Sequence, residues 1–228
     1  MDRVKTTAII VAAGSGSRFQ SETPKQFLDL AGKPIVVHTI ERFASAPSVD
    51  SIVVVLSSEN VTRLGPGGFS KPLKVVTGGA SRAESVLNGL NAIDADTQIV
   101  AVHDGARPFV STYEIERTIE KAKSIGAACL VGPVTDTIKT VSGEEISGTL
   151  DRNKLRRALT PQVFKTEVLR RAFDLGELSE AVTDECYLVE KLGHPIAFVE
   201  GSSRNIKITH NEDLLLAEAI EREMRNEK

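Results

Sequence analysis

The sequence has few of the residues on which several common kinds of site depend. It contains no tryptophan and two cysteines, Cys129 and Cys186, among 228 residues, and aromatic residues make up 4% of the chain. The two cysteines lie far apart, and neither has a neighbouring cysteine or the spacing of metal ligands. A cysteine-based metal site is therefore not expected. We predict that both cysteines are reduced and serve in packing.

The chain also lacks an excess of positive charge and a long apolar run. Its formal net charge is -3, so no overall basic field attracts nucleic acid or anionic lipid. No apolar run approaches the ~20 residues that span a bilayer, and the N-terminus has no segment of the signal-peptide type. We expect a cytoplasmic protein that binds neither nucleic acid nor membrane. Any phosphate site must be built from local charges.

What the sequence does have is a regular succession of strand-like and helix-like segments. Hydrophobic residues make up 41% of the chain, enough for one sizeable core, and we expect a single domain over residues 1–228. Near-continuous apolar runs such as Ile52–Leu56 are typical of strands covered on both faces. We expect strands at 7–12, 51–56, 73–77, 98–103 and 127–131. The pattern predicts an α/β fold with a mostly parallel, Rossmann-like sheet.

Capping signals mark several of the helices between and after these strands. Ser81 with Glu84, and Ser111 with Glu114, have the spacing of a capping box, in which each side chain bonds to the backbone of the other residue. Asn211 is expected to cap the last helix. We assign no chemistry to these helices.

One segment, residues 136–151, departs from the alternation of strands and helices. Two alternating stretches, 136–141 and 146–150, flank Ser142–Glu145, which is the pattern of a β-hairpin. A lone two-stranded hairpin is marginally stable in water, so we expect this one to pack against a partner subunit in a homodimer. An edge hairpin that lies on its own sheet is the alternative.

A glycine-rich turn follows the first strand and is the strongest sign of a phosphate site. Residues 12–18 read Ala-Ala-Gly-Ser-Gly-Ser-Arg, and a Pro-Lys-Gln element follows shortly after. Small residues let backbone N–H groups approach an anion, while Arg18 and Lys25 add positive charge. A dinucleotide-binding loop would need a third glycine where Phe19 stands, and the Gly-Lys-Ser/Thr ending of a Walker loop does not follow. The turn therefore predicts a triphosphate site, with an ordinary tight turn carrying solvated cations as the alternative.

Two further clusters directly follow expected strands. Gly78–Arg82 lies at the carboxyl end of a strand, where open α/β sheets bind ligands, and its backbone could read a nucleobase edge. An ordinary turn is the alternative. In His103–Pro108, Asp104 could organise a hydrated Mg²⁺ or a hydroxyl, and Arg107 could reach a second anion. The alternative is an internal ion pair between Asp104 and Arg107, with His103 a hydrogen-bonded core residue.

After the hairpin, Asp151–Asn153 and then Leu159–Gln162 carry polar side chains suited to a phosphate. Arg152 could hold a phosphate through two hydrogen bonds, and the hydroxyl of Thr160 could complete the cradle. The alternative is that Asp151 and its neighbours form ordinary ion pairs on a solvated surface.

The segment Asn205–Thr209 near the C-terminus alternates in polarity as a strand does. Its two isoleucines should face the core, while its polar side chains share the opposite face. A lysine that protects an edge strand from pairing is the alternative. Because Arg18 and Lys25 already indicate a phosphate site, we expect Lys207 to act there as well.

Taken in order, these elements resemble one known family. The set comprises the glycine-rich turn, Pro24–Gln26, Gly78–Gly79, His103–Pro108, Asp151–Arg152, Thr160–Gln162, Thr183–Glu185 and Asn205–Thr209. It is similar to the 2-C-methyl-D-erythritol 4-phosphate cytidylyltransferases of non-mevalonate isoprenoid biosynthesis, from about Ala8 to Ala219. The resemblance implies a nucleotidyltransferase sheet with a protruding β-arm that interlocks two subunits into a homodimer. It also implies that CTP and a sugar-alcohol phosphate are the substrates, with a Mg²⁺ ion held mainly by the CTP phosphates.

The resemblance carries roles over to particular residues. Arg18 and Lys25 correspond to residues that stabilise the charge developing on the α-phosphate of CTP. Arg152 and Lys207 correspond to residues that position the sugar phosphate for attack. Residues that would hold the nucleotide are Ala12, Ala13, Gly14, Gly16, Gly79, Ser85 and Asp104. Residues that would contact the sugar phosphate, some of them across the dimer, are Asp104, Arg107, Thr137, Thr160 and Thr183.

Other functions remain open on the sequence alone. A ribitol-5-phosphate cytidylyltransferase shares the glycine-rich turn and the Pro-Lys-Gln element, although the small pair Gly105-Ala106 before Arg107 favours the methylerythritol enzyme. The chain could also be a nucleotide-binding regulator without chemistry, but the joint presence of Arg18, Lys25 and Lys207 argues against it. A structural dimer module is supported by the hairpin alone.

Overall fold

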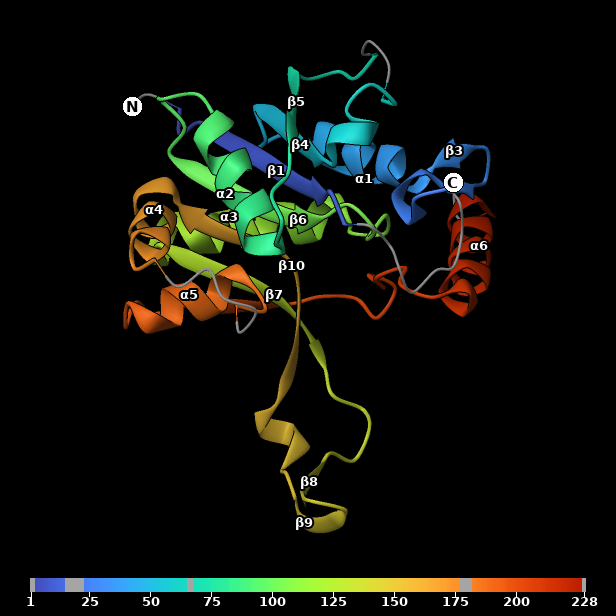
Figure 1. Ribbon diagram of the computed structural model, residues 1–228, viewed down its shortest axis with the longest axis vertical. Helices are drawn as coiled ribbons and strands as arrows, with labels where there is room; N and C mark the ends of the chain where they lie inside the picture. Colours follow the sequence, from blue (N-terminus) through green and yellow to red (C-terminus); the bar gives the residue numbers. More distant parts are fainter. Residues whose placement is uncertain (1–2, 15–22, 65–67, 177–181, 227–228) are drawn as a thin grey trace.

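The computed structural model describes residues 3–14, 23–64, 68–176 and 182–226, so Gly16 and Arg18 lie outside the described residues. Its centre is a seven-stranded sheet with the order β11-β7-β10-β6-β1-β4-β5 (Figure 1). The strands of this sheet are β1 (Thr6–Ala12), β4 (Ser51–Leu56), β5 (Leu73–Thr77), β6 (Ile99–Asp104), β7 (Ala127–Pro133), β10 (Arg156–Lys165) and β11 (Ala197–Glu200). The helices are α1 (Ile35–Ala44), α2 (Arg82–Ala92), α3 (Thr112–Ile125), α4 (Thr166–Asp174), α5 (Glu185–Lys191) and α6 (Asn211–Asn226).

The sheet is mostly parallel, as the sequence predicts. β1 runs parallel to β4 and β6, β4 runs parallel to β5, and β7 runs parallel to β11. β10 runs antiparallel to both of its neighbours, and its pairing with β7 shifts register between Ala158 and Gln162. The five strands expected for the sheet, at 7–12, 51–56, 73–77, 98–103 and 127–131, are present, whereas β10 and β11 were not expected. β10 begins with two arginines and contains Pro161, which a central strand normally avoids.

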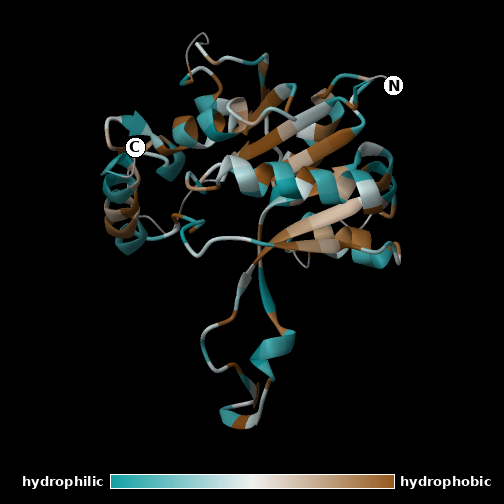
Figure 2. Cartoon of the chain, turned by 180° about the vertical axis from the view of Figure 1, so that it is seen from behind, coloured by the Kyte–Doolittle hydropathy of each residue, from teal (hydrophilic) through white to brown (hydrophobic). Residues whose placement is uncertain are grey.

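Helices cover both faces of the sheet and form a three-layer structure. One core lies between the sheet and helices α1 and α3, and it contains Ile10 and Val54. The other lies between the sheet and helices α2, α4 and α5, and it contains Ile9 and Val55. Neighbouring strand residues enter opposite cores because side chains alternate across a strand. This explains the near-continuous apolar runs, which Figure 2 shows in the central strands.

The helix ends match the predicted caps in part. Ser111 and Glu114 form a complete capping box at the start of α3. At α2 the Ser81 hydroxyl accepts from the backbone N–H of Glu84, but the Glu84 carboxylate accepts from Ala80 instead of Ser81. The prediction for Asn211 is wrong, because this residue is the first of α6, and the carboxylate of Asp213 accepts the backbone N–H groups of Thr209 and His210. None of the helices in the described part of the chain is long and apolar enough to cross a membrane.

The predicted hairpin forms an arm outside the three layers. β8 (Lys139–Ser142) and β9 (Glu145–Thr149) make a separate two-stranded sheet that projects away from the body of the protein (Figure 1). Val141 and Ile146 on the arm are each 68% exposed. The alternative of a hairpin lying on its own sheet is therefore wrong. Exposed apolar side chains on a lone hairpin are the reason for expecting a partner subunit at this arm.

Candidate active site

A cavity of about 430 Å³ opens at the carboxyl ends of β1 and β6 and beside the turn between β5 and α2. This is the edge of a parallel sheet at which α/β proteins bind ligands. Its walls combine the start of the glycine-rich turn with charged side chains from distant segments. The lining residues include Ala12, Ala13, Gly14, Lys25, Gln26, Gly79, Ala80, Ser81, Arg82, Ser85, Asp104, Ala106, Lys207 and Thr209.

The side chain of Gln26 positions the beginning of the glycine-rich turn. Gln26 lies in a 3-10 helix, η2 (Lys25–Phe27), and is 3% exposed. Its amide N–H₂ donates to the backbone oxygen of Ala12 at 2.8 Å and, more weakly, to that of Gly14 at 3.4 Å. Sequence reasoning gave a role to Lys25 and none to Gln26. A buried amide that satisfies loop carbonyls holds the loop in one shape, which a phosphate site made of backbone N–H groups requires.

The turn before α2 presents backbone groups to the same cavity. The Ser85 hydroxyl accepts the backbone N–H of Gly79 at 3.1 Å and donates to the backbone oxygen of Ser81 at 2.9 Å. A Cβ atom on Gly79 would overlap the Cβ atom of Glu84, so glycine is required for this close approach. Gly79 and Ser85 are thus brought together, as the sequence predicts. A fixed turn of this kind can read the edge of a base through its backbone.

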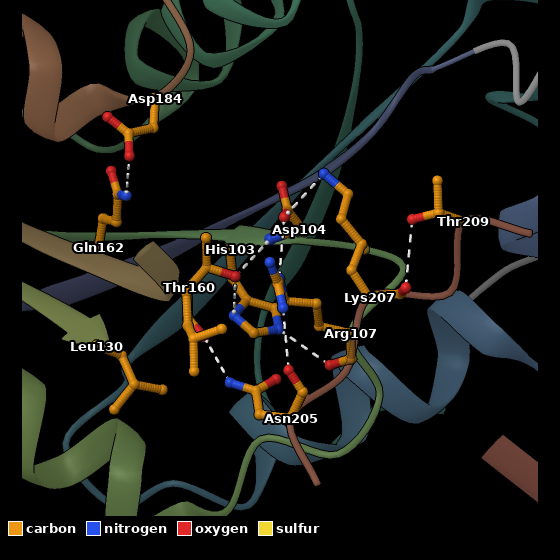
Figure 3. Close-up of polar contacts among 12 residues, drawn as sticks. His103, Asp104, Arg107, Leu130, Thr160, Gln162, Asp184, Asn205, Lys207 and Thr209 are labelled. Carbon is orange, nitrogen blue, oxygen red and sulfur yellow. Dashed lines mark hydrogen bonds and ion pairs between the residues drawn. The ribbon is translucent and has the colours of Figure 1, made fainter. Parts of the chain in front are cut away.

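Asp104 is the centre of a charge cluster at the floor of the cavity (Figure 3). Its Oδ1 lies 3.4 Å from Nε of Arg82, and its Oδ2 lies 3.1 Å from Nε of Arg107 and 3.0 Å from Nζ of Lys207. Burial by itself raises the pKa of this carboxyl, but the three cations outweigh burial and hold the pKa well below its usual range. Asp104 is therefore an anion at neutral pH.

Arg82 is a site residue that sequence reasoning did not single out. It ends the turn Gly78–Arg82, whose predicted role rests on its backbone groups alone. It is the first residue of α2 and lines the cavity. The signal that could have identified it is a cation placed at the carboxyl edge of the sheet directly after two glycines.

Arg107 forms the internal ion pair that the sequence left open as an alternative. Its Nε lies beside Asp104, and its NH1 donates to the backbone oxygen of Asn205 at 2.9 Å. The guanidinium thereby joins the end of β6 to the segment that carries Lys207. Arg107 is absent from the described lining of the cavity.

His103 is a buried member of the same network, which confirms the alternative that it is a hydrogen-bonded core residue. Its Nδ1 lies 3.0 Å from the hydroxyl of Thr160, and its Nε2 lies 3.1 Å from the backbone oxygen of Arg107. Since that oxygen can only accept, we assign the proton to Nε2, and the Thr160 hydroxyl donates to Nδ1. The Thr160 hydroxyl also accepts the backbone N–H of Asp104 at 3.2 Å. Burial lowers the pKa of His103 to about 4, so the ring is neutral.

The low pKa of His103 predicts a loss of stability in mild acid. The unfolded chain binds a proton at this ring below about pH 6.5, whereas the folded chain resists it down to about pH 4. Stability should therefore fall as the pH drops from about 6.5 to 4, by up to about 3 kcal/mol from this group. Urea unfolding at several pH values measures the slope.

A matched pair of variants assigns that slope to His103. We expect His103→Gln to flatten the decline between pH 6.5 and 4.5, a window above the usual pKa of a carboxyl. His210→Gln, at an exposed position, should keep the wild-type slope. Equal slopes in all three proteins would mean that another group is responsible.

Lys25 and Lys207 are brought into the same cavity from positions far apart in the sequence. Nζ of Lys25 donates to the backbone oxygen of Ile208 at 3.1 Å, which links the 3-10 helix η2 to the segment Asn205–Thr209. That segment is irregular, so the predicted strand is wrong there. Asn205 is buried and donates from Nδ2 to the backbone oxygen of Thr160, so it does not share the face of Lys207. Ile208 is buried, as predicted.

The remaining predicted residues lie outside this cavity in the single chain. Thr137 and Arg152 are exposed on the arm, where NH1 of Arg152 donates to the backbone oxygen of Thr135 at 2.7 Å. Thr183 is exposed just before α5, and Thr160 is buried under Asp104. The structure thus joins those nucleotide residues that it describes with Lys207 in one chain, but not the arm residues.

Comparisons of the sequence and of the fold with known proteins point to one family. The model of a family described as 2-C-methyl-D-erythritol 4-phosphate cytidylyltransferase matches residues 6–223. A protein of that name from Desulforamulus reducens is 43% identical over 93% of this chain and 94% of its own length. One from Geotalea uraniireducens is 41% identical over 99% of this chain and 100% of its own. The crystal structure of the protein of that name from Thermus thermophilus superposes with a TM-score of 0.78 at 35% identity, covering 96% of this chain and 99% of the other.

Proposed function

The chain belongs to the 2-C-methyl-D-erythritol 4-phosphate cytidylyltransferase family, and on that premise we propose where its substrates bind and which side chains act on them. The protein is a nucleotidyltransferase that joins CTP and 2-C-methyl-D-erythritol 4-phosphate. The products are 4-diphosphocytidyl-2-C-methyl-D-erythritol and pyrophosphate, in the non-mevalonate route to isoprenoids. The family membership gives the overall reaction, and the roles of the individual residues are proposed below.

CTP occupies the 430 Å³ cavity, and the observation that carries this placement is that Lys25 and Lys207 line it together with Gly14. The triphosphate lies against the glycine-rich turn, where backbone N–H groups and lysine ammonium groups meet negative charge. The base lies against the turn at Gly79 and Ser85. Arg18 completes the phosphate site in this proposal, although it lies outside the described residues.

The reaction is an in-line displacement at the α-phosphorus. An oxygen of the methylerythritol phosphate forms a bond to that phosphorus, and the bond to the bridging oxygen of the pyrophosphate breaks. No side chain of the protein needs to act as a nucleophile. Lys25 stabilises the negative charge that grows on the α-phosphate, and Lys207 holds the incoming phosphate in line. Both are cations that line the cavity, as does Arg82, whose guanidinium is engaged with the Asp104 carboxylate.

A magnesium ion accompanies the nucleotide in this proposal. The described residues contain no group of three or more acidic, histidine or cysteine side chains that could hold a metal ion. Asp104 is the carboxylate at the cavity, and its oxygens already face Arg82, Arg107 and Lys207. This donor set fits an ion held mainly by phosphate oxygens. When bound, Mg²⁺ neutralises charge on the phosphates.

Two subunits pair through their arms in this proposal. The exposed side chains of Val141 and Ile146 supply apolar surface for a partner. In a symmetric dimer Arg152 and Thr137 of one subunit contact the sugar phosphate in the cleft of the other, because they are far from the cavity of their own chain. Thr183, which is exposed just before α5, contacts the same phosphate in this proposal, and Arg107 and Thr160 act from beneath Asp104. The free, buried state of Cys129 and Cys186 supports a cytoplasmic location.

The substrate assignment is tested by comparing two sugar phosphates. We expect CTP-dependent pyrophosphate release with 2-C-methyl-D-erythritol 4-phosphate and at least ~10²-fold lower kcat/KM with ribitol 5-phosphate, since a cleft shaped for one polyol leaves polar groups unpaired with another. The measurement is a coupled pyrophosphate assay with each substrate at equal concentration. Equal rates would make the ribitol enzyme the better description. No release with either would favour the non-catalytic regulator.

A further inference from the structure

The start of α5 is built so that one carboxylate is buried under the cavity. Oε1 of Gln162 accepts the backbone N–H groups of Glu185 and Cys186 at 3.1 and 3.0 Å. Nε2 of Gln162 donates to Asp184 at 2.9 Å, and Asp184 in turn accepts the backbone N–H of Tyr187 (Figure 3). These hydrogen bonds hold the first turn of α5 in a single orientation. In that orientation the side chain of Glu185 is 0% exposed.

Glu185 is paired with Arg82 on the opposite side of the cavity floor. The two Oε atoms of Glu185 lie 2.6 and 3.0 Å from NH1 and NH2 of Arg82, the fork geometry that holds a guanidinium in one plane. The third nitrogen of the same guanidinium, Nε, lies 3.4 Å from Oδ1 of Asp104. The buried carboxylate of Glu185 thus fixes the guanidinium of Arg82, whose Nε faces the carboxylate of Asp104 in the cavity.

Stability alone is a poor reason for this arrangement. Buried ion pairs contribute little net stability, because desolvation of both charges offsets their attraction. Here the pair has a further effect, since it engages Oδ1 of Asp104 and leaves Oδ2 to Arg107 and Lys207. The orientation of the Asp104 carboxylate therefore decides where the ammonium group of Lys207 lies, 3.0 Å from Oδ2.

We propose that Glu185 and Arg82 form a positioning pair, which orients the carboxylate of Asp104 and thereby holds Lys207 where the incoming phosphate binds. Neither residue contacts the reacting atoms. They act through a series of contacts: Glu185 in α5 holds Arg82 in α2, Arg82 contacts Asp104 at the end of β6, and Asp104 contacts Lys207. The inference rests on the proposal that the substrates occupy this cavity.

The pair is tested by two conservative variants. Glu185→Gln keeps the size of the side chain but removes the charge, and Arg82→Lys keeps the charge but cannot meet two carboxylates at once. We expect each to lower kcat about 10- to 100-fold, the effect of misplacing a reacting group by about 1 Å, with a smaller change in the KM for CTP. Glu41→Gln, which breaks the exposed pair of Glu41 and Lys33, is the matched control and should keep wild-type kinetics.

A double-mutant cycle separates positioning from general loss of structure. If Glu185 acts through Lys207, the variant that carries both Glu185→Gln and Lys207→Met will have nearly the kcat of Lys207→Met alone, because the second change has nothing left to position. Multiplicative losses would overturn the proposal, as would a wild-type kcat in both Glu185→Gln and Arg82→Lys. Thermal melting of every variant is measured first, and all assays are run below the lowest unfolding temperature. If either Glu185→Gln or Arg82→Lys is too unstable to assay, the other variant alone tests the proposal.

The same set of proteins distinguishes failure of the pair from failure of the site. If Lys25→Ala and Lys207→Met keep full activity, the substrates bind elsewhere and the proposed site is wrong. If those two lose activity while Glu185→Gln and Arg82→Lys do not, the site stands and the positioning pair is refuted.

Discussion

Replacing Lys25 by alanine is expected to lower kcat by ~10²–10³-fold while CTP binding weakens far less. The reason is that the negative charge on the α-phosphate grows as the new bond forms, so an ammonium group beside it stabilises the transition state more than the bound substrate. Lys25 is placed for this by the 3-10 helix η2 and by its hydrogen bond to the backbone oxygen of Ile208. Steady-state kinetics give kcat, and equilibrium dialysis with CTP gives the dissociation constant.

Lys33→Ala is the control for this experiment. Lys33 is a half-exposed lysine that is paired with Glu41, and it does not line the cavity. Its replacement should leave kcat unchanged, which would show that loss of one positive charge is not sufficient. A Lys25→Ala protein with normal kcat and a raised KM for CTP would assign Lys25 to ground-state binding.

A mixed dimer of two inactive variants is expected to recover activity. Arg152 lies on the arm and Lys25 in the cleft, so in the proposed dimer Arg152→Ala damages the site of the partner and Lys25→Ala damages the site of its own chain. In a heterodimer of the two, both defects fall on one cleft and the other cleft is intact. Activity should rise from near zero to about half of wild type, since one of two symmetric sites works.

The mixed dimer is made by co-expression with two affinity tags and purified over both. The control heterodimer combines Lys25→Ala with Lys207→Met. Both of these residues line the cavity of their own chain, so each cleft keeps one defect and no activity should return. Recovery in the control, or none in the test pair, would rule out the contribution of the arm to the partner's cleft.

Much of the fold could be predicted because its signals are local. The runs that form β1 and β4 are apolar on both faces, and the capping box of Ser111 and Glu114 lies within a single turn of helix. β10 could not be predicted in this way. Its first half extends from the arm, where its arginines are solvated, and its second half crosses the core, so no single periodicity describes it.

The site could be predicted where one segment carries both the signal and the function. Gly14, Lys25 and Lys207 come from short motifs, and the structure brings them to one cavity. Arg82 and Glu185 are separated by 103 positions, and nothing near either residue in the sequence reveals the other. The interior position of Asn205 could not be predicted, because its segment does not pair with a strand. The backbone oxygen of Asn205 accepts from Arg107, and its side chain donates to the backbone oxygen of Thr160.

β10 has a consequence for how homologues can differ in length. It begins at the base of the arm, and further on it carries Thr160 beneath the cavity. Insertions at the tip of the arm, around Gly143, would lengthen the excursion and leave the sheet in register. One residue inserted after Thr160 would exchange Val163 and Phe164 between the two cores on either side of the sheet. Length variation should therefore accumulate at the tip of the arm and be removed by selection from β10, which follows the arm in the chain.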